Sequence, residues 1–415
     1  MLAAFVMALP AFSQTEEDIK AASEAAIAQN DIVKKGVSFG PFPIVGFDQN
    51  KGLQLGALCN IYNFGDGSWY PTPKSQWYFE ASFFTQGSML FIINYDNKTL
   101  IPGVRMCIGA TFNNNKALDF FGFNGYAQHI ETDLPSSYYK MSRLVPCFKA
   151  DFTGQIYNHF YWKAGYQFKY FKTGNHEPKD GPVPTLFDDY VNLGYIDPSE
   201  VDGGFTSSVR AGIMYDSRDF EAEPTRGIWA EADIEGAPKW LGTSVPYAKY
   251  DLIFRNYLPI VKKRLVFAYR LSLQGFFNDP AYYVLPFESQ LGYGYDRDGF
   301  GGYRNIRGLV ANRLQGRSVF YFNTELRYHF VDFHLLKQNI GLAVNAFCDG
   351  GSVIAPFGNR PSDDRETIHP AVGGGFRIIV NRNFVIAADY GVPLNKQDCP
   401  IGKGGSFYVN TGFLF

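Results

Sequence analysis

Most of the chain repeats one pattern, in which apolar and polar side chains alternate residue by residue over runs of about ten residues. Residues 228–234 show it clearly, because Ile228, Ala230, Ala232 and Ile234 alternate with Trp229, Glu231 and Asp233. A β-strand directs successive side chains to opposite faces, so a period of two separates an apolar face from a polar one. The pattern is typical of a transmembrane barrel, whose outer face meets lipid and whose inner face lines a lumen.

The same alternation recurs from Leu53 onward. One face of residues 160–170 carries Phe160, Trp162, Ala164, Tyr166, Phe168 and Tyr170, and the other carries Lys163, Gln167 and Lys169. The composition agrees with two separate surfaces, because the chain is 17% aromatic and only 19% charged. Beyond the N-terminus, no apolar run approaches the roughly 18 residues that a membrane helix needs. We therefore predict an all-β transmembrane barrel.

A soluble β-sandwich would also alternate, with its aromatic face packed against a second sheet. Two features favour the barrel. Aromatic residues recur at strand ends, as the interfacial girdles of a membrane barrel require. The alternation also continues to the C-terminus through Phe407, Val409, Thr411, Phe413 and Phe415.

Counting the alternating runs predicts sixteen antiparallel strands. They begin near Leu53, Gln76, Met89, Gly103, Asp119, Tyr138, Asn158, Gly204, Gly227, Val245, Arg264, Arg317, Gln338, Ala371, Asn383 and Gly405. The long connections follow odd-numbered strands and comprise residues 172–202, 276–316, 351–370 and 392–404. Long loops on one rim and short turns on the other are typical of outer-membrane barrels, whose short turns face the periplasm. The sixth strand contains Pro146, which cannot donate a hydrogen bond to a ladder.

The N-terminal residues predict export. Residues 1–13 combine a short apolar run with small residues, as in a secretory signal peptide that is cut before Gln14. Residues 14–36 form a short leader, in which Thr15 precedes two acidic residues as a helix N-cap would. A flexible periplasmic leader and a plug that enters the barrel are both compatible with this segment. The barrel is predicted to occupy residues 37–415.

Composition and motifs argue against several other functions. A formal net charge of −2 gives no electrostatic footprint for nucleic acid. The five cysteines include no CxxC pair and are expected to be isolated small residues. Acids between Asp188 and Asp202 could hold Ca²⁺, but a solvated loop is the simpler interpretation. Protease, hydrolase and phosphate-loop motifs are absent. We predict no enzyme activity, no cofactor and no metal site.

Several separated motifs resemble the bacterial surface antigen family, the sixteen-stranded barrels of the BamA and TamA superfamily. The sequence IRG at residues 306–308 is similar to the Arg-Gly motif of that family's sixth extracellular loop, and NTELR at residues 323–327 to the strand after it. FCDGG at residues 347–351 resembles the F-x-D-x-G motif of the next strand. Residues 215–227 resemble the hairpin between strands eight and nine. The resemblance covers about residues 36–415, and the order and spacing of the motifs make it specific.

The alternation places two acids of these motifs, Glu325 and Asp349, on the polar face that lines the lumen. The resemblance implies that the sixth extracellular loop folds inward and carries Arg307 and Gly308 to them. In the family this contact pins the loop inside the barrel, and we expect Arg307 to pair with Asp349 and with Glu325. A guanidinium group suits this role because its planar fork binds a carboxylate at two points.

The resemblance also implies a place for function. Family members that insert or translocate other proteins use the seam between the first and last strands, whose exposed edge templates an incoming strand. Here the seam strands are expected to be residues 53–62, with Leu53 and Leu55, and residues 406–415, with Phe413 and Phe415. The expected localisation is the bacterial outer membrane. The expected partners are membrane lipid and other outer-membrane proteins, a periplasmic partner, or further copies of this chain.

Such proteins usually also carry periplasmic polypeptide-transport-associated domains, for which this sequence leaves no room between the signal and the barrel. We therefore expect a barrel-only member that works in outer-membrane protein insertion, translocation or assembly with a partner. The alternative is a passive pore or solute transporter. In that case selectivity would be set by lumenal charges, which could instead simply pack the lumen: Lys163, Arg210, Glu231, Asp233 and Arg270.

Overall fold

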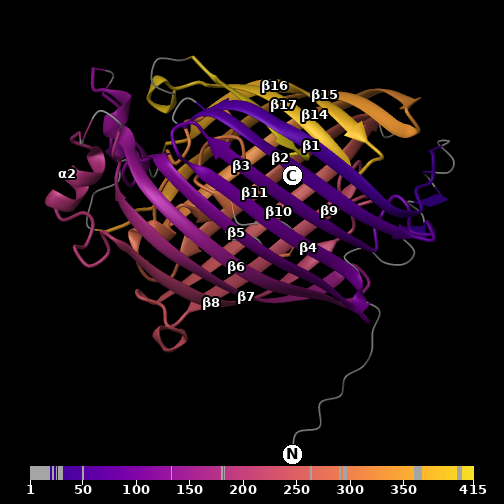
Figure 1. Ribbon diagram of the computed structural model, residues 1–415, viewed down its shortest axis with the longest axis horizontal. Coiled ribbons are helices and arrows are strands. Elements are labelled where there is room, and N and C mark those ends of the chain that lie inside the picture. The colour runs from indigo at the N-terminus through magenta and orange to yellow at the C-terminus, as the bar shows by residue number, and fades with distance from the viewer. Residues whose placement is uncertain are drawn as a thin grey trace, which may run out of the picture.

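The computed structural model describes residues 19–20, 23–24, 26, 31–48, 51–131, 133–178, 181, 183–261, 264–288, 291–292, 297–358, 367–399 and 404–415. The predicted signal peptide lies outside the described residues. Sixteen strands form one antiparallel sheet that curves into a barrel, which confirms the predicted fold (Figure 1). Among the helices that are described, none has the length and apolar character needed to cross a membrane.

The strands of the barrel follow one another in chain order, each paired with the next. They are β1 (Gly36–Asp48), β2 (Gly52–Gly65), β3 (Ser75–Phe84), β4 (Met89–Ile101), β5 (Val104–Asp119), β6 (Lys140–Tyr157), β7 (Phe160–Asn175), β8 (Gly203–Asp216), β9 (Gly227–Ala237), β10 (Tyr247–Val261), β11 (Leu265–Phe276), β14 (Ser318–Leu335), β15 (Gln338–Ala355), β16 (His369–Val380), β17 (Phe384–Pro393) and β18 (Ser406–Thr411).

The remaining elements lie in the connections. They are α2 (Leu186–Asn192), the two-residue strands β12 (Phe287–Glu288) and β13 (Arg297–Asp298), and the 3-10 turns η1 (Gly125–Ala127), η2 (Ser136–Tyr139), η3 (Lys239–Leu241), η4 (Tyr282–Val284) and η5 (Lys396–Asp398). Helix α2 begins at a capping box, in which Thr185 and Asp188 each accept from the other's backbone N–H.

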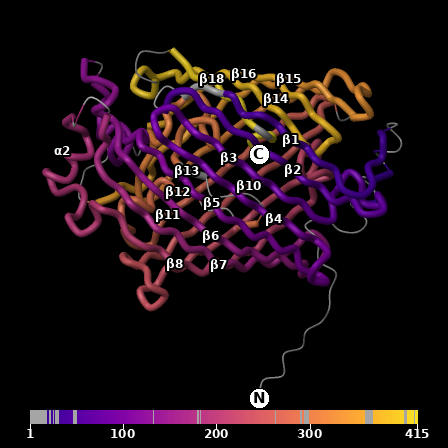
Figure 2. Tube along the Cα trace, viewed as in Figure 1, coloured from indigo at the N-terminus to yellow at the C-terminus, as the bar shows by residue number. Residues whose placement is uncertain are grey.

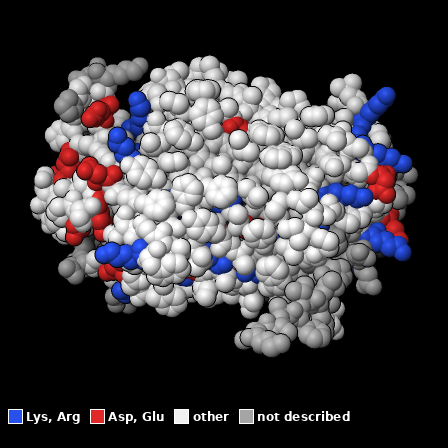
Figure 3. All heavy atoms as spheres, turned by 60° about the horizontal axis from the view of Figure 1, so that its bottom comes forward, with Lys and Arg blue, Asp and Glu red and all other residues white. Residues whose placement is uncertain are grey.

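The strands separate polar and apolar side chains as the alternation predicts. On β9, Ile234 is 60% exposed on the outer face, whereas Glu231 and Asp233 are buried inside. Figure 3 shows one outer face of the molecule, where charged residues gather toward the two ends and the band between them is mostly uncharged. This band has the character of a lipid-facing surface.

The first strand of the barrel is β1, which corrects the prediction that the first strand starts at Leu53. Leu53 belongs to β2, which pairs with β1 along its whole length. The prolines Pro41 and Pro43 made residues 36–48 look like a connection. Both are tolerated because β1 is a terminal strand of the sheet, and an edge strand can lack donors on its outer side.

The strand predicted near Asp119 does not exist, and this second error cancels the first in the count of sixteen. Residues 120–139 instead connect β5 to β6 and form part of an aromatic cap over the long-loop end of the barrel. The cap buries side chains from four connections and from the strand ends beside them, among them Phe120, Phe123, Tyr190, Tyr247, Tyr282, Tyr283, Phe287 and Phe357. Its aromatic residues alternate poorly because they pack against one another rather than against lipid.

The two rims differ as predicted, with the long connections 120–139, 176–202, 277–317, 356–368 and 394–405 on one rim and short turns on the other. Five residues of the leader, at positions 19, 20, 23, 24 and 26, are helical. Figure 2 shows β1, in indigo, beside the yellow C-terminal strands. The rings of Phe42 on β1 and Phe384 on β17 lie 6.2 Å apart, so the two ends of the sheet meet.

Candidate functional site in the barrel lumen

The connection between β11 and β14, residues 277–317, folds into the lumen and is called loop six below. Within this loop, Phe287 binds side chains of the barrel wall. The carbonyl oxygen of Phe287 accepts from Lys249 Nζ at 2.7 Å and from Gln274 Nε2 at 2.9 Å. Its ring lies against two cations, 4.4 Å from Lys169 Nζ and 4.9 Å from the Arg143 guanidinium. Lumenal cations of the barrel wall thus bind both the backbone and the ring of one loop residue.

Further along, loop six contacts strand β6. The Gly292 N–H donates to Asp151 Oδ2 at 3.1 Å, and its carbonyl accepts from Lys149 Nζ at 2.9 Å. Both side chains come from β6. The loop therefore reaches across the lumen before it turns back toward β14.

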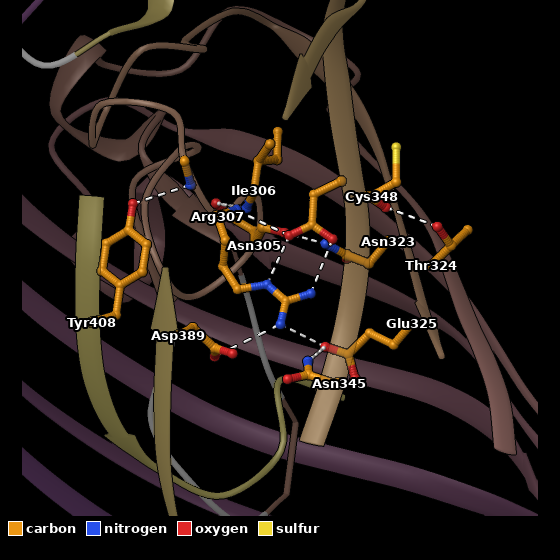
Figure 4. Close-up of polar contacts among 12 residues, drawn as sticks. Asn305, Ile306, Arg307, Asn323, Thr324, Glu325, Asn345, Cys348, Asp389 and Tyr408 are labelled. Atoms are coloured by element: carbon orange, nitrogen blue, oxygen red, sulfur yellow. Dashed lines mark hydrogen bonds and ion pairs between the residues drawn. The ribbon is translucent and has the colours of Figure 1, made fainter. Parts of the chain in front are cut away.

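The centre of the site is Arg307, which is fully buried. Its Nε donates to Asp349 Oδ2 at 2.8 Å, its Nη2 to Asp349 Oδ1 at 3.1 Å, and its backbone N–H also to Oδ2 at 3.0 Å. The third nitrogen, Nη1, lies 2.5 Å from Glu325 Oε1 and 3.7 Å from Asp389 Oδ2. The Phe347 ring lies 3.6 Å from the guanidinium carbon. Figure 4 shows the guanidinium group between the strands that carry Glu325 and Asp389.

The charges around Arg307 balance. Glu325 also pairs with Arg327 at 2.6 Å, and Asp389 with Arg377 at 2.9 Å, so three guanidinium groups meet the carboxylates of Glu325, Asp349 and Asp389. A buried charge without a partner is costly, so this network is stable only while every member is present.

Gly308 brings the backbone of loop six directly onto the barrel wall. It has a φ of +99°, which favours glycine. A Cβ at this position would lie 2.9 Å from Ala371 Cβ and 3.1 Å from the Val392 nitrogen, so a side chain does not fit. The Gly308 N–H donates to the Tyr408 hydroxyl at 3.1 Å. Loop six is thereby joined to β18, the last strand.

The tip of the loop is shaped by Asn305. Its Oδ1 accepts from the N–H groups of Gly301 at 2.8 Å and Ile306 at 3.0 Å, and its carbonyl accepts from Asn323 on β14 at 2.5 Å. Ile306 and Leu309 on either side of the Arg-Gly pair are buried in a small apolar cluster with residues of β14, β15 and β16. The tip therefore has one defined conformation against the wall.

Comparison with known proteins agrees with this geometry. Residues 76–415 match the Omp85 superfamily domain. The chain belongs to the Omp85 superfamily. None of the curated proteins gives a sequence match. Its barrel is similar to BamA from Haemophilus ducreyi lacking POTRA domains 1–3, with a TM-score of 0.54, 14% identity, and coverage of 91% of this chain and 70% of that one.

The barrel is also similar to CdiB from Escherichia coli, with a TM-score of 0.58, 11% identity, and coverage of 92% of this chain but only 63% of that one. At such identities the likeness concerns the fold. Together with the family match, it identifies the chain as a bacterial outer-membrane barrel related to BamA and CdiB.

In this Omp85 barrel, Arg307, Gly308, Glu325 and Asp349 lie together in one lumenal cluster. Sequence patterns did not single out Asp389, Tyr408 or Gly391, whose backbone lies against Gly308, although signals for them exist. Asp389 is the lone acid on the inward parity of β17, and Tyr408 has the parity opposite to Phe407 and Val409. Gly391 is a strand-interior glycine, which often marks a close backbone approach.

The seam residues are placed differently from the prediction. Leu53 and Leu55 lie on β2, one strand away from the end of the sheet. Phe413 and Phe415 follow the end of β18, because Gly412 has a φ of +92° and turns the chain off the strand. Phe415 is buried in the lumen, where its backbone oxygen accepts from Arg327 at 2.9 Å. The seam of this Omp85 barrel therefore lies between β1 and residues 406–411.

Proposed function

We propose that this Omp85 barrel takes part in the insertion, translocation or assembly of outer-membrane proteins, and that an incoming chain pairs with the edge of β1. The observation that carries this proposal is the unequal length of the two terminal strands. β1 spans 13 residues, whereas β18 spans six. A strand of six residues leaves backbone groups along the longer edge without a strand partner, and such an edge templates an incoming strand.

The outer surface of β1 supports this role, because Phe39 is 67% exposed and Val45 is 73% exposed. A client strand that is added there would have its own apolar face in lipid. The Tyr408 contact adds a link to the interior. Because the Gly308 N–H donates to Tyr408 on β18, a movement of β18 would either break this hydrogen bond or move loop six with it.

The passive pore is the weaker alternative. A cavity of about 440 Å³ lies toward the short-turn end, but loop six and the aromatic cap occupy the other end. The lumenal charges are also paired. Lys163 lies 2.5 Å from Glu231 and 3.1 Å from Asp233, and Arg210 lies 2.6 Å from Asp151. These contacts suit packing of the lumen better than selection of a solute.

A reversible lock on the seam tests the proposal. The full-length protein carries cysteines at Phe39 and Val409, which are both exposed on the outer face, and is reconstituted in liposomes. Thiol crosslinkers of graded length then bridge β1 to β18. The measured quantity is the rate at which a chaperone-held, urea-unfolded eight-stranded barrel reaches its folded gel mobility.

We expect the bridged protein to act no faster than empty liposomes, and cleavage of the bridge to restore the rate. The matched control bridges Ile213 on β8 to Ile234 on β9, two outward residues of neighbouring strands. It should leave the rate unchanged. Equal activity with the seam bridged and free would contradict the proposal.

A further inference from the structure

At the short-turn rim, the sheet ends in the first residues of β1 and the last residues of β18. The middle of β1 contains Pro41 and Pro43, which lack backbone donors. The last strand stops at Thr411, and Gly412 then turns the chain inward. Contacts outside the two terminal strands also join this rim.

Residues 31–34, which precede β1, run across this rim and are called the strap. The strap meets β15 at Asn339, which is buried. The Ile32 N–H donates to Asn339 Oδ1 at 2.9 Å, and Asn339 Nδ2 donates to the Ile32 carbonyl at 3.2 Å. One side-chain amide thus satisfies both backbone groups of Ile32, as a neighbouring strand would.

The strap also makes an ion pair with the turn between β16 and β17, where Arg382 Nε donates to Asp31 Oδ2. Asp31 and Arg382 are largely buried, with side-chain exposures of 10% and 25%. A partly buried, charge-assisted bond of this kind is stronger than an ordinary surface pair. Lys34 Nζ donates to the carbonyl of Lys337 in the turn between β14 and β15. The strap is therefore tied to two turns of the C-terminal side of the sheet.

The turn between β2 and β3 meets the strap through Val33, and it is also bonded directly to the C-terminal side of the sheet. Asn339 Nδ2 donates to the Tyr70 hydroxyl at 2.8 Å, and Asn383 Nδ2 donates to the Pro71 carbonyl at 2.6 Å. Tyr70 is fully buried in a cluster with Ala26 and Phe64, against which Val33 packs. Burial, with Asp31 nearby, raises the pKa of Tyr70 to about 12.

We propose that the strap, which leads directly into β1, fastens the start of β1 to β15 and to the turns beside β15 and β17 at the short-turn rim, and that its release is what allows the β1–β18 seam to open there. The fastening is inferred from the contacts of Asp31, Ile32 and Lys34, which act beside the direct bonds from Asn339 to Tyr70 and from Asn383 to Pro71. Its use as a gate for an incoming chain rests on the proposed function. The partner that would release it is one that competes for the Asp31 carboxylate or the Ile32 backbone.

Distance measurements between spin labels test the fastening without any client. Labels replace Phe39 on β1 and Val409 on β18, both exposed near this rim. We expect one narrow distance distribution in the full chain and a shift toward longer distances in Asp31→Arg and in Arg382→Asp. The double variant, which restores an ion pair of opposite polarity, should return the distribution to its original width.

A second variant removes the other contact. Asn339→Ala should also broaden the distribution. The control is Asn256→Ala, which removes a similar bond from an asparagine amide to a tyrosine hydroxyl, here that of Tyr269. That bond joins β10 to β11, away from the strap, so the distribution should not change. Heat-dependent gel mobility verifies that every variant is folded. An unchanged distribution in both Asp31→Arg and Asn339→Ala overturns the proposal, as does a double charge reversal that fails to restore it. A wild-type protein that inserts no client would overturn only the proposed function.

Discussion

The backbones of Gly308 and Gly391 touch, because a Cβ on Gly391 would lie 2.7 Å from the Gly308 nitrogen and 2.9 Å from its Cα. Gly391 lies on β17, opposite Gly373 of β16 and Ser406 of β18. The barrel wall therefore carries only small side chains, or none, where the backbone of loop six lies against it. This contact explains why the glycine of the Arg-Gly pair needs a second glycine far away in the sequence.

Gly391→Ala should destabilise the barrel by about 1–3 kcal/mol, because the added methyl group displaces the loop backbone from the wall. The free energy of unfolding in urea, measured in detergent micelles, checks this. The control is Gly236→Ala on β9, where no atom lies within 4 Å of the added carbon. If the two variants lose the same free energy of unfolding, the contact between Gly391 and Gly308 does not contribute to stability beyond an ordinary glycine position.

Arg307→Ala should cost about 3–5 kcal/mol, because it leaves Asp349 buried without its two-point partner. Arg307→Lys should recover only part of this, since an ammonium group cannot form the paired bonds to both carboxylate oxygens. The measurement is the temperature at which the folded gel mobility is lost.

The matched control is Arg317→Ala at the end of the same loop. Arg317 is 41% exposed and lies 3.7 Å from the exposed Asp279, so its loss should cost at most about 1 kcal/mol. If Arg307→Ala and Arg317→Ala unfold at the same temperature, loop six is not pinned by Arg307.

The alternation of side chains was enough to predict the barrel and the lumenal position of Glu325 and Asp349. It fails where the local pattern serves another purpose. In β1, Pro41 and Pro43 conceal a strand, because the freedom of an edge strand to lack donors is set by its place in the sheet and not by its own sequence. Near Phe120, aromatic residues belong to a cap that is assembled from distant loops, so no short-range period marks them.

The contacts of the site likewise divide into those that the sequence predicts and those that only the tertiary structure determines. Arg307 and its acids could be predicted because the motifs that contain them resemble a known family. The contacts of Asp389 and Gly391 with loop six depend on how far the loop extends across the lumen, and the length of the loop does not determine this. Phe415 continues the alternation to the last residue, yet it leaves the sheet, because Gly412 adopts a positive φ and Arg327 binds the terminal residue inside.

Glu221 should make stability depend on pH. It lies in the turn between β8 and β9, 3.0 Å from Arg105 and 3.3 Å from Lys98. Burial alone would raise the pKa of this carboxyl, but Arg105 and Lys98 outweigh it and hold the pKa below its ordinary value of 4.5. The stabilisation is therefore complete above the unfolded-state pKa and is lost as the pH falls through the folded-state value.

Urea unfolding of the wild type and Glu221→Gln at a series of pH values checks this. The stability difference should be constant above about pH 5 and shrink below the ordinary carboxyl pKa. In a background that lacks both Arg105 and Lys98 charges, the same substitution should give a much weaker dependence on pH. A difference that stays constant at acid pH would contradict the assignment.

Phe287→Ala should make the barrel leak ions, because this residue holds the descending part of loop six. Its ring lies between Arg143 and Lys169 and is part of the aromatic cap, so its removal loosens the loop and the cap together. In planar bilayers we expect the wild type to be mostly closed and Phe287→Ala to open more often. Phe277→Ala, in the same loop but 68% exposed, serves as the control and should behave as the wild type. A wild type with a steady open conductance, unaffected by Phe287→Ala, would instead indicate a pore that loop six does not close.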